Sequence, residues 1–220
     1  MWRFPTHPYI RSVNSTWLRV MSLLYDPFVW LGEVMGMRRR RRDLVARASG
    51  RVLEIGAGTG LNLPHYPATI DELILAEPEP GMRRRLARRL RRLGRTAEIV
   101  DAPAERLALP DASVDTVVST LVLCTVADPE RALREIARVL SPDGQLLFIE
   151  HVRADSRWLA GCQDRLLSPW RAFAGGCVCN RDTLGAMMAC EFTTEVERGT
   201  WRGMPAIVGP LAIGRAVSRR

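Results

Sequence analysis

The sequence contains no lysine, and all 32 of its basic residues are arginine. Enzymes that depend on a lysine are therefore excluded, including Lys-dependent P-loop proteins and pyridoxal phosphate enzymes that form a Schiff base. The formal net charge of +8 would suit a nucleic-acid-binding protein. Because a single residue type supplies all of the positive charge, we interpret it as a compositional bias. We therefore expect no nucleic-acid partner, and an Arg-rich nucleic-acid-binding protein stays as an alternative.

Cysteines are few, and none of them forms a Cys-x-x-Cys pair. The five are Cys124, Cys162, Cys177, Cys179 and Cys190. Cys177 and Cys179 are separated by one residue, but neither a histidine nor a second cysteine pair lies near them in the sequence. We therefore predict no metal site. An odd set of cysteines without a recognisable secretory signal favours reduced thiols and a cytoplasmic location.

The sequence also lacks the run of about 20 apolar residues that a membrane-spanning helix needs. Its most apolar stretch, residues 15–37, is interrupted by Arg19, Asp26, Pro27 and Glu33. We predict two short helices broken near Pro27, as part of an N-terminal helical cap or lid over residues 1–50. Peripheral contact with a membrane through residues 15–37 is the alternative. The run Arg38–Arg42 is expected at a solvated helix end, or against a phosphate or an anionic lipid.

From residue 51 the hydrophobic pattern alternates between strands and helices. Runs rich in apolar and β-branched residues predict strands over residues 51–55, 72–77, 97–102, 114–123 and 145–152. Helical spacing appears in residues 80–94, and again in residues 129–140 after Asp128, a good N-cap. A helix-rich segment, 155–190, precedes two runs, 191–198 and 206–217, that can pair as antiparallel strands. This order predicts an α/β fold with a parallel sheet and helices on both faces.

A glycine-rich turn follows the first predicted strand. In such a sheet, this turn lies where ligands bind, and glycine lets the backbone approach a ligand closely. Gly56, Gly58 and Gly60 give the spacing G-x-G-x-G, whereas the dinucleotide-binding motif is G-x-G-x-x-G. Glu77 ends the second strand about 20 residues further on, where a carboxylate can accept hydrogen bonds from both hydroxyls of a ribose.

This compact turn, preceded by Glu54, resembles that of the class I S-adenosylmethionine-dependent methyltransferases, and the resemblance continues through residues 102–152. It implies a Rossmann-like fold with a seven-stranded, mostly parallel sheet and a final antiparallel strand. The methyltransferase domain would span residues 51–220, behind the N-terminal cap. S-adenosylmethionine would be the cofactor.

The resemblance also assigns residues to the cofactor: Glu54, Gly56, Ala57, Gly58, Gly60, Glu77, Ala104, Glu105, Thr120 and Leu121. The glycine turn would lie against the methionine and ribose portions, and Glu77 would hold the ribose. Ala104 and Glu105 would border the adenine, and Thr120 and Leu121 the methionine part. Relatives often carry Asp where this chain has Pro103. Whether Asp101 or another acidic group meets the adenine amino group is therefore open.

Later segments narrow the resemblance to the thiol S-methyltransferase group of methyltransferase-like proteins and their bacterial relatives. They are TLVLCTV, IEHV, Trp158, Gln163, SPWRAFAGGC and NRDT. The acceptor would then be a small molecule, with a thiol as one candidate. Quinone and phospholipid head-group methyltransferases share the same core and stay as alternatives. A nicotinamide-dependent oxidoreductase is disfavoured by the glycine spacing and by the absence of lysine, and a non-catalytic cofactor-binding scaffold remains a further alternative.

Glu150 and His151 are the candidate catalytic residues. Consecutive residues of a strand point to opposite faces, so we expect only one of them to face the site. A thiol acceptor, with a pKa near 8.5, would need little or no general base. We expect His65 to shape the glycine loop. Trp158, Trp170 and Phe173 are candidate walls of an acceptor pocket, with a place in the core as the equal alternative.

Overall fold

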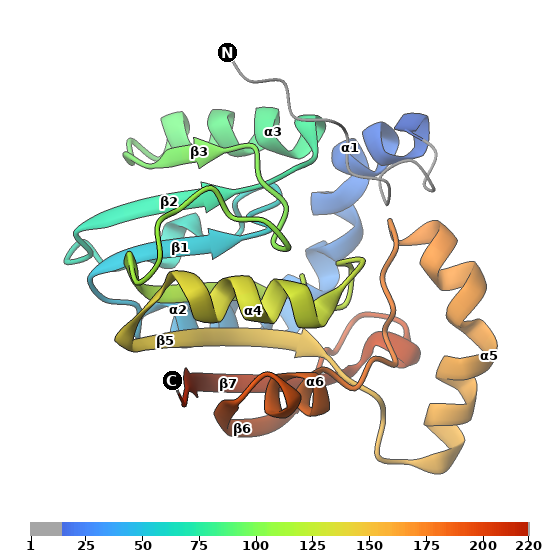
Figure 1. Cartoon of the computed structure of the whole chain (residues 1–220). Coiled ribbons are helices and arrows are strands. Elements are labelled where there is room, and N and C mark those ends of the chain that lie inside the picture. Colours follow the sequence, from blue (N-terminus) through green and yellow to red (C-terminus); the bar gives the residue numbers. More distant parts are fainter. Residues whose placement is uncertain (1–14, 220) are drawn as a thin grey trace.

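The computed structural model describes residues 15–219, so residues 1–14 of the predicted cap lie outside it. A seven-stranded sheet with the order β3-β2-β1-β4-β5-β7-β6 runs through the molecule (Figure 1). Its strands are β1 Arg51–Ile55, β2 Glu72–Ala76, β3 Glu98–Val100, β4 Val114–Thr120, β5 Leu140–His151, β6 Phe192–Thr200 and β7 Pro210–Ser218. Strands β1 to β5 pair in parallel, and β7 is antiparallel to both β5 and β6. The predicted mostly parallel sheet with a final antiparallel strand is confirmed.

Six α-helices surround the sheet in the described part of the chain. They are α1 Ser15–Gly32, α2 Arg38–Val45, α3 Pro80–Arg92, α4 Pro129–Val139, α5 Arg157–Phe173 and α6 Thr183–Ala189. Apolar residues of α4 and α6 share one core cluster with Phe148 of β5. Residues of α2 and α3 share the cluster on the other face with Leu147. Figure 1 shows α1 and α5 beyond the carboxyl ends of the strands.

Local sequence accounts for where the two central helices begin. The Asp128 side chain accepts a hydrogen bond from the backbone N–H of Arg131, which confirms Asp128 as the N-cap of α4. The Glu79 side chain does the same for α3 through the backbone N–H of Met82. Proline occupies the first turn of both helices, where its missing N–H has no helical partner to lose. These caps and prolines fix the first turns of α3, which follows β2, and of α4, which follows β4.

The N-terminal segment differs from the prediction. The expected break near Pro27 is wrong, because α1 continues through that residue to Gly32. Pro27 is exposed, so its ring and the lost hydrogen bond fall on the solvent side of the helix. The interruption comes instead in the π-helical turn Glu33–Met37, where Gly36 has φ 131°, a conformation that favours glycine.

The run Arg38–Arg42 is also not uniformly solvated. Arg41 is buried, and its guanidinium donates to Glu33 Oε1 at 2.9 Å and to Asn62 Oδ1 at 3.1 Å. The prediction of a solvated helix end is therefore wrong for Arg41. A buried charge needs a partner of opposite sign, and the π-helical turn places Glu33 where it can provide one.

Strand β4 ends earlier than the pattern of β-branched residues predicted. It stops at Thr120, and Leu121 takes a left-handed conformation with φ 61°. The backbone N–H of Val122 then donates to Glu150 Oε1 at 3.0 Å, so residues 121–123 form a loop rather than a strand. This loop carries side chains into the site described below.

The cap and the sheet share one core. Val29 of α1, Met37 and Leu44 are buried in the same cluster as Val52 of β1 and Leu147 of β5. None of the helices between residues 15 and 219 combines the length and the hydropathy of a membrane-spanning segment. The described part of the cap is therefore packed against the domain.

Candidate functional site

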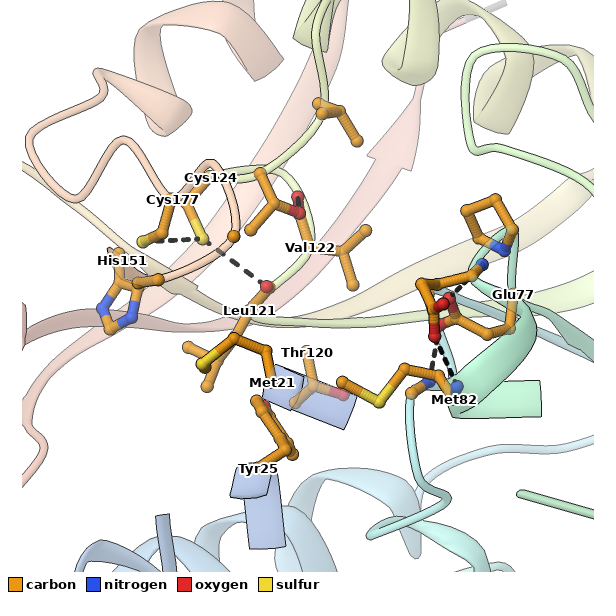
Figure 2. A pocket seen from close by; sticks show the side chains of 18 of the residues that line it. Met21, Tyr25, Glu77, Met82, Thr120, Leu121, Val122, Cys124, His151 and Cys177 are labelled. Atoms are coloured by element: carbon orange, nitrogen blue, oxygen red, sulfur yellow. Dashed lines mark hydrogen bonds between the residues drawn. The ribbon is translucent and has the colours of Figure 1, made fainter. Parts of the chain in front are cut away.

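A cavity of about 290 Å³ lies at the carboxyl ends of the parallel strands. Helix α1 contributes Met21 and Tyr25 to its wall, and the glycine turn, the loop after β4 and the segment after α5 provide other sides. Figure 2 shows Glu77 at one end of this space and Cys124, His151 and Cys177 at the other. We name the first the carboxylate end and the second the cysteine end.

The glycine turn forms part of the carboxylate end. Gly56, Gly58 and Gly60 have φ values of 54°, 57° and 83°, so all three take the left-handed conformation. A Cβ on Gly58 would meet only Gly56 O, at 3.8 Å, because this residue borders the cavity. A Cβ on Gly60 would lie 2.8 Å from Leu63 and from Leu86. Gly58 therefore leaves room for a ligand, whereas Gly60 leaves room for core packing.

Glu77 lies beside this turn, at the end of β2. Its Oε2 accepts from the backbone N–H of Gly58 and its Oε1 from that of Glu79, each at 2.8 Å. Burial raises the pKa of Glu77 to about 7, although both hydrogen bonds lower it. The backbone thus fixes the carboxylate at the edge of the cavity.

Glu54 takes a different position. Its carboxylate accepts from Tyr66 Oη at 2.7 Å and from Asn62 Nδ2 at 2.9 Å. Burial raises its pKa to about 7, opposed by these hydrogen bonds. Asn62 Nδ2 also donates to Thr120 Oγ1 at 2.6 Å. Glu54 does not border the cavity, and it supports the turn and β4 through Asn62.

The predicted adenine side lies along the segment that contains Pro103, Ala104 and Glu105, all of which border the cavity. Glu105 Oε1 accepts from the backbone N–H of Ala127 at 2.9 Å. Asp101 does not border the cavity, and it forms two hydrogen bonds with the Arg83 guanidinium, at 2.8 and 2.7 Å. Glu105 is therefore the acidic side chain that this segment brings to the cavity.

The other assigned residues divide between the wall and the core. Thr120 and Leu121 border the cavity between its two ends (Figure 2). Ala57 is buried in the core cluster and does not border the cavity. The side chains of Glu54 and Ala57, and the space where a Cβ of Gly60 would lie, meet other protein atoms rather than the cavity. These three positions support the turn, and their assignment to the cofactor stays a prediction.

The two catalytic candidates point to different sides of β5. Glu150 is fully buried away from the cavity, where its Oε1 accepts from Ser119 Oγ at 2.6 Å and from the Val122 N–H. Burial raises its pKa. The Glu150 carboxylate thus holds the loop after β4 and lies outside the cavity wall, and its catalytic role stays a prediction. His151 borders the cavity, as the alternation of a strand requires for one of the pair.

His151 is buried, and its ring stacks on that of Trp201 with 5.7 Å between centroids. Its Nδ1 atom has no hydrogen-bond partner among residues 15–219. Burial lowers the pKa of His151 to about 4, so the imidazole is neutral at pH 7. A base this weak is poorly matched to proton abstraction at neutral pH.

Cys124 and Cys177 complete the cysteine end. Their Sγ atoms are 3.7 Å apart, and both residues are buried. The two loops that carry them are joined, because the Val178 N–H donates to Cys124 O at 2.8 Å. Gln163 of α5 fixes the same region by donating from Nε2 to Cys179 O at 3.2 Å and to Ile207 O at 3.0 Å.

The three aromatic candidates for the wall of the acceptor pocket lie in different environments. Trp170 borders the cavity, whereas Trp158 is 75% exposed and Phe173 packs against the Trp170 ring at 5.9 Å. The prediction of an acceptor-pocket wall is therefore wrong for Trp158 and Phe173. His65 lies in the 3-10 turn Leu63–His65 beside the glycine loop, outside the cavity wall.

The cap contributes to the site in a way that the sequence did not reveal. Asp26 of α1 accepts from Thr59 Oγ1 at 2.5 Å and from Arg89 Nη2 at 2.6 Å. Arg89 of α3 also donates to Thr59 O at 2.9 Å. Asp26 thus ties the cap to the glycine turn. In the sequence, the apolar residues of 15–37 gave the only sign that this segment packs on the domain.

The carboxylate end fits S-adenosylmethionine. Gly58 leaves an open approach to the backbone, and Glu77 presents a fixed carboxylate to a ribose. Met82 lies at the same end in Figure 2, and Pro103 also borders the cavity. Both side chains are apolar and suit the faces of an adenine ring.

Comparison with known proteins agrees with this geometry. Residues 53–148 match the methyltransferase domain family. The chain is 34% identical over 173 residues to the thiol S-methyltransferase TMT1B of Rattus norvegicus, a match that covers 76% of this chain and 70% of that protein. It is 33% identical over 131 residues to the phosphatidylethanolamine N-methyltransferase of Cereibacter sphaeroides, over 59% of this chain and 64% of that protein. The crystal structure of the N-methyltransferase NodS from Bradyrhizobium japonicum, in complex with S-adenosyl-L-homocysteine, has a similar fold. Its TM-score is 0.63 at 18% identity, over 84% of this chain and 86% of that chain.

Proposed function

The chain belongs to the class I S-adenosylmethionine-dependent methyltransferases, and from this premise we propose that it methylates a small-molecule thiol. The observation that supports this acceptor is the composition of the cysteine end. The described residues that border this end include His151, Cys124, Cys177 and Trp170, but no carboxylate or arginine. A thiol is already partly ionised near neutral pH, so it can react without a strong base. Amine and phenol acceptors would need a general base to remove a proton.

The residues that would bind the cofactor lie at the carboxylate end of the cavity, and the acceptor would bind at the cysteine end. The cofactor supplies an electrophilic methyl group on its sulfonium. Glu77 and the turn at Gly58 would hold the ribose and methionine portions, and Glu105 would lie on the adenine side. Met21 and Tyr25 of the cap lie along the middle of the cavity (Figure 2) and add apolar surface to its wall. This protein therefore contributes mainly alignment and a site of low water content.

Calorimetric titration with S-adenosylmethionine and with its demethylated product tests the cofactor assignment. We expect wild-type protein to bind both. Glu77→Ala should weaken binding by about 100-fold, because two hydrogen bonds to a charged acceptor contribute about 3 kcal/mol together. Asp101→Asn is the matched control, since Asp101 pairs with Arg83 outside the cavity, and its affinity should stay within about twofold of wild type. Folded wild-type protein that binds neither ligand would contradict the assignment.

Methyl-transfer assays then test the acceptor. Small alkyl and aryl thiols should be methylated, and their oxygen analogues should not react. Transfer to quinols or to ethanolamine head groups, with thiols inert, would support the alternative acceptors instead. Assays over a range of pH should show thiol methylation rising as the free thiol ionises.

We also propose that α1 makes peripheral contact with a membrane. Large apolar side chains of α1 and of the π-helical turn after it face solvent, with Leu23 59%, Trp30 60% and Val34 55% exposed. The same helix lines the cavity through Met21, so an apolar acceptor could enter directly from a lipid surface. All five cysteines lie within residues 15–219 and are free, which supports a cytoplasmic location.

Vesicle flotation tests the contact. Vesicles of neutral and anionic phospholipid should bind wild-type protein, and Leu23→Ser combined with Trp30→Ser should reduce the bound fraction. Trp158→Ser is the matched control, because that tryptophan is 75% exposed on α5. An equal loss in the control, or no binding by wild type, would contradict the contact.

A further inference from the structure

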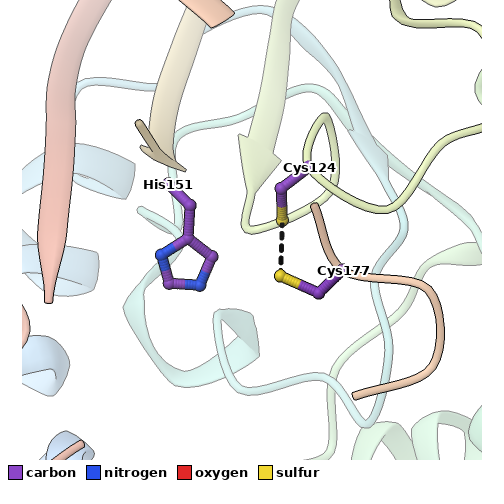
Figure 3. A group of neighbouring side chains, drawn as sticks. All are labelled: Cys124, His151 and Cys177. Carbon is purple, nitrogen blue, oxygen red and sulfur yellow. Dashed lines mark hydrogen bonds between the residues drawn. The ribbon is translucent and has the colours of Figure 1, made fainter. Parts of the chain in front are cut away.

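Three potential metal ligands converge at the cysteine end. Cys124 comes from the loop after β4, His151 from the end of β5 and Cys177 from the loop after α5, as Figure 3 shows. One nitrogen or sulfur atom from each lies within 4.8 Å of the other two. All three residues are buried, with exposures of 1%, 3% and 5%. The chain thus brings together a donor set that is dispersed in the sequence.

The spacing of the two sulfur atoms suits a shared tetrahedral ion. Zinc–sulfur bonds of about 2.3 Å at a tetrahedral angle place two sulfur ligands about 3.8 Å apart. The observed distance between Cys124 Sγ and Cys177 Sγ is 3.7 Å. A disulfide would require about 2.05 Å, so the pair is not cross-linked.

The histidine supplies the nitrogen ligand. Its ring lies beside the two cysteines in Figure 3, with Nε2 toward their sulfur atoms and Nδ1 on the far side of the ring. The Nε2 atom of a neutral imidazole is a common zinc ligand.

Charge balance also favours an ion of charge +2. Two thiolates and a neutral imidazole around Zn²⁺ give a site with no net charge, which is compatible with burial. Sulfur and imidazole donors suit zinc, whereas magnesium and calcium prefer oxygen. No carboxylate takes part in this group of ligands.

We propose that Cys124, Cys177 and His151 bind one zinc ion and leave its fourth coordination position open to the cavity. All three residues border the cavity, so a ligand there can reach the ion. Three protein ligands with one open position is the arrangement of catalytic rather than structural zinc sites. Zinc binding itself does not depend on the proposed function. The binding of an acceptor thiol to the ion, described next, rests on the proposed function.

The open position would take the sulfur of the acceptor thiol. Binding displaces the thiol proton to water and leaves a thiolate on the ion at neutral pH. The thiolate sulfur then forms the bond to the methyl carbon. The bond from that carbon to the sulfonium sulfur breaks, and its electron pair stays on the departing S-adenosylhomocysteine. The neutral thioether product is a weaker ligand than the thiolate and can leave the ion.

Metal analysis of the full chain tests the site without any activity measurement. The protein is reduced, stripped with a chelator, reloaded with zinc alone and dialysed, and its zinc is measured by mass spectrometry. Wild type should retain about one ion per chain. Cys177→Ala and Cys124→Ala should each weaken zinc affinity by more than about 100-fold. Cys179→Ala is the matched control, because this buried cysteine lies outside the group of ligands and should leave retention unchanged.

Cobalt as a substitute for zinc tests the open position. Addition of a small thiol to the cobalt-loaded protein should increase the thiolate-to-cobalt absorption, and Cys179→Ala should behave in the same way. Failure of the reduced wild type to retain zinc would overturn the site, as would equal retention by both ligand variants. Calorimetry with S-adenosylmethionine on the same samples separates this failure from that of the proposed function, because Glu77 and the glycine turn lie at the other end of the cavity.

Discussion

The two ends of the cavity are built in different ways. The centre of the carboxylate end comes from the glycine turn after β1 and from the end of β2, which follow one another along the chain. Its central contact joins Gly58 and Glu77. The cysteine end joins three segments, and Cys124 and Cys177 alone are 53 residues apart. A motif of fixed spacing can describe the first end, whereas only the fold brings the second together.

The ends also differ in the kind of group that faces the cavity. Backbone N–H groups fix a carboxylate at one end, and this arrangement suits the polar ribose of a cofactor. Soft sulfur and a neutral imidazole face the cavity at the other end. Substitutions at the carboxylate end should therefore affect cofactor binding, and substitutions at the cysteine end should affect activation of the acceptor.

Substitution of His151 should separate the two ends most strongly. We expect His151→Gln to lower the turnover of a thiol by about 100-fold, since it removes one of the three proposed zinc ligands from the acceptor side. The dissociation constant for S-adenosylmethionine should change less than about twofold. Methyl-transfer kinetics and calorimetry on the same preparation measure both quantities. His65→Gln is the control, and equal losses of turnover and cofactor affinity in His151→Gln would contradict the separation.

Cofactor affinity should depend on pH through the carboxylate end. The pKa of Glu77 is raised to about 7 in the free protein, so the carboxyl group is mostly protonated at pH 6. Ribose binding needs the carboxylate, and affinity should therefore rise about tenfold between pH 6 and pH 8. The same shift affects the stability of the fold. Below pH 4.5, the pKa of Glu77 in the unfolded chain, the protonated carboxyl group contributes its full stabilisation. This contribution is lost as the pH rises to the folded-state pKa of about 7.

Calorimetry in buffers of different ionisation enthalpy measures this dependence and the proton released. Glu77→Gln should bind weakly at both pH values and show little dependence. Glu54→Gln should keep the dependence, because the pKa of Glu54 is also raised to about 7 but its carboxylate lies outside the cavity wall. A flat profile in wild type, or its loss in Glu54→Gln, would assign the proton to another group.

Loosening the cap should have the smallest effect and reach both ends. Asp26→Asn weakens the contact of α1 with Thr59 and Arg89. We expect cofactor affinity and turnover to fall together by about threefold, which corresponds to the 0.2–1 kcal/mol of a partly exposed ion pair. Limited proteolysis should cut the cap faster in the variant. Glu130→Gln, in an exposed pair with Arg134, is the control and should be neutral.

The strands could be predicted from the sequence, but the positions of several individual side chains could not. The strands around the glycine turn followed from periodicity, because alternation and β-branched residues are local properties. Glu54 and Glu77 are equally prominent beside the motif, yet only Glu77 borders the cavity. Glu54 points at Asn62 and Tyr66 instead, and no sequence spacing reveals such a partner. Pro27 was expected to end a helix, and its exposed position let α1 continue.

The sequence by itself determined the order of the strands and helices, the glycine turn and the acidic residue that follows β2, because each depends on neighbours along the chain. The tertiary structure decided which of Glu150 and His151 faces the cavity, that Asp26 ties the cap to the turn, and that Cys177 meets Cys124 rather than Cys179. Those contacts join segments that are distant in sequence. Sheet order and loop packing bring such segments together, and neither leaves a periodic pattern in the chain.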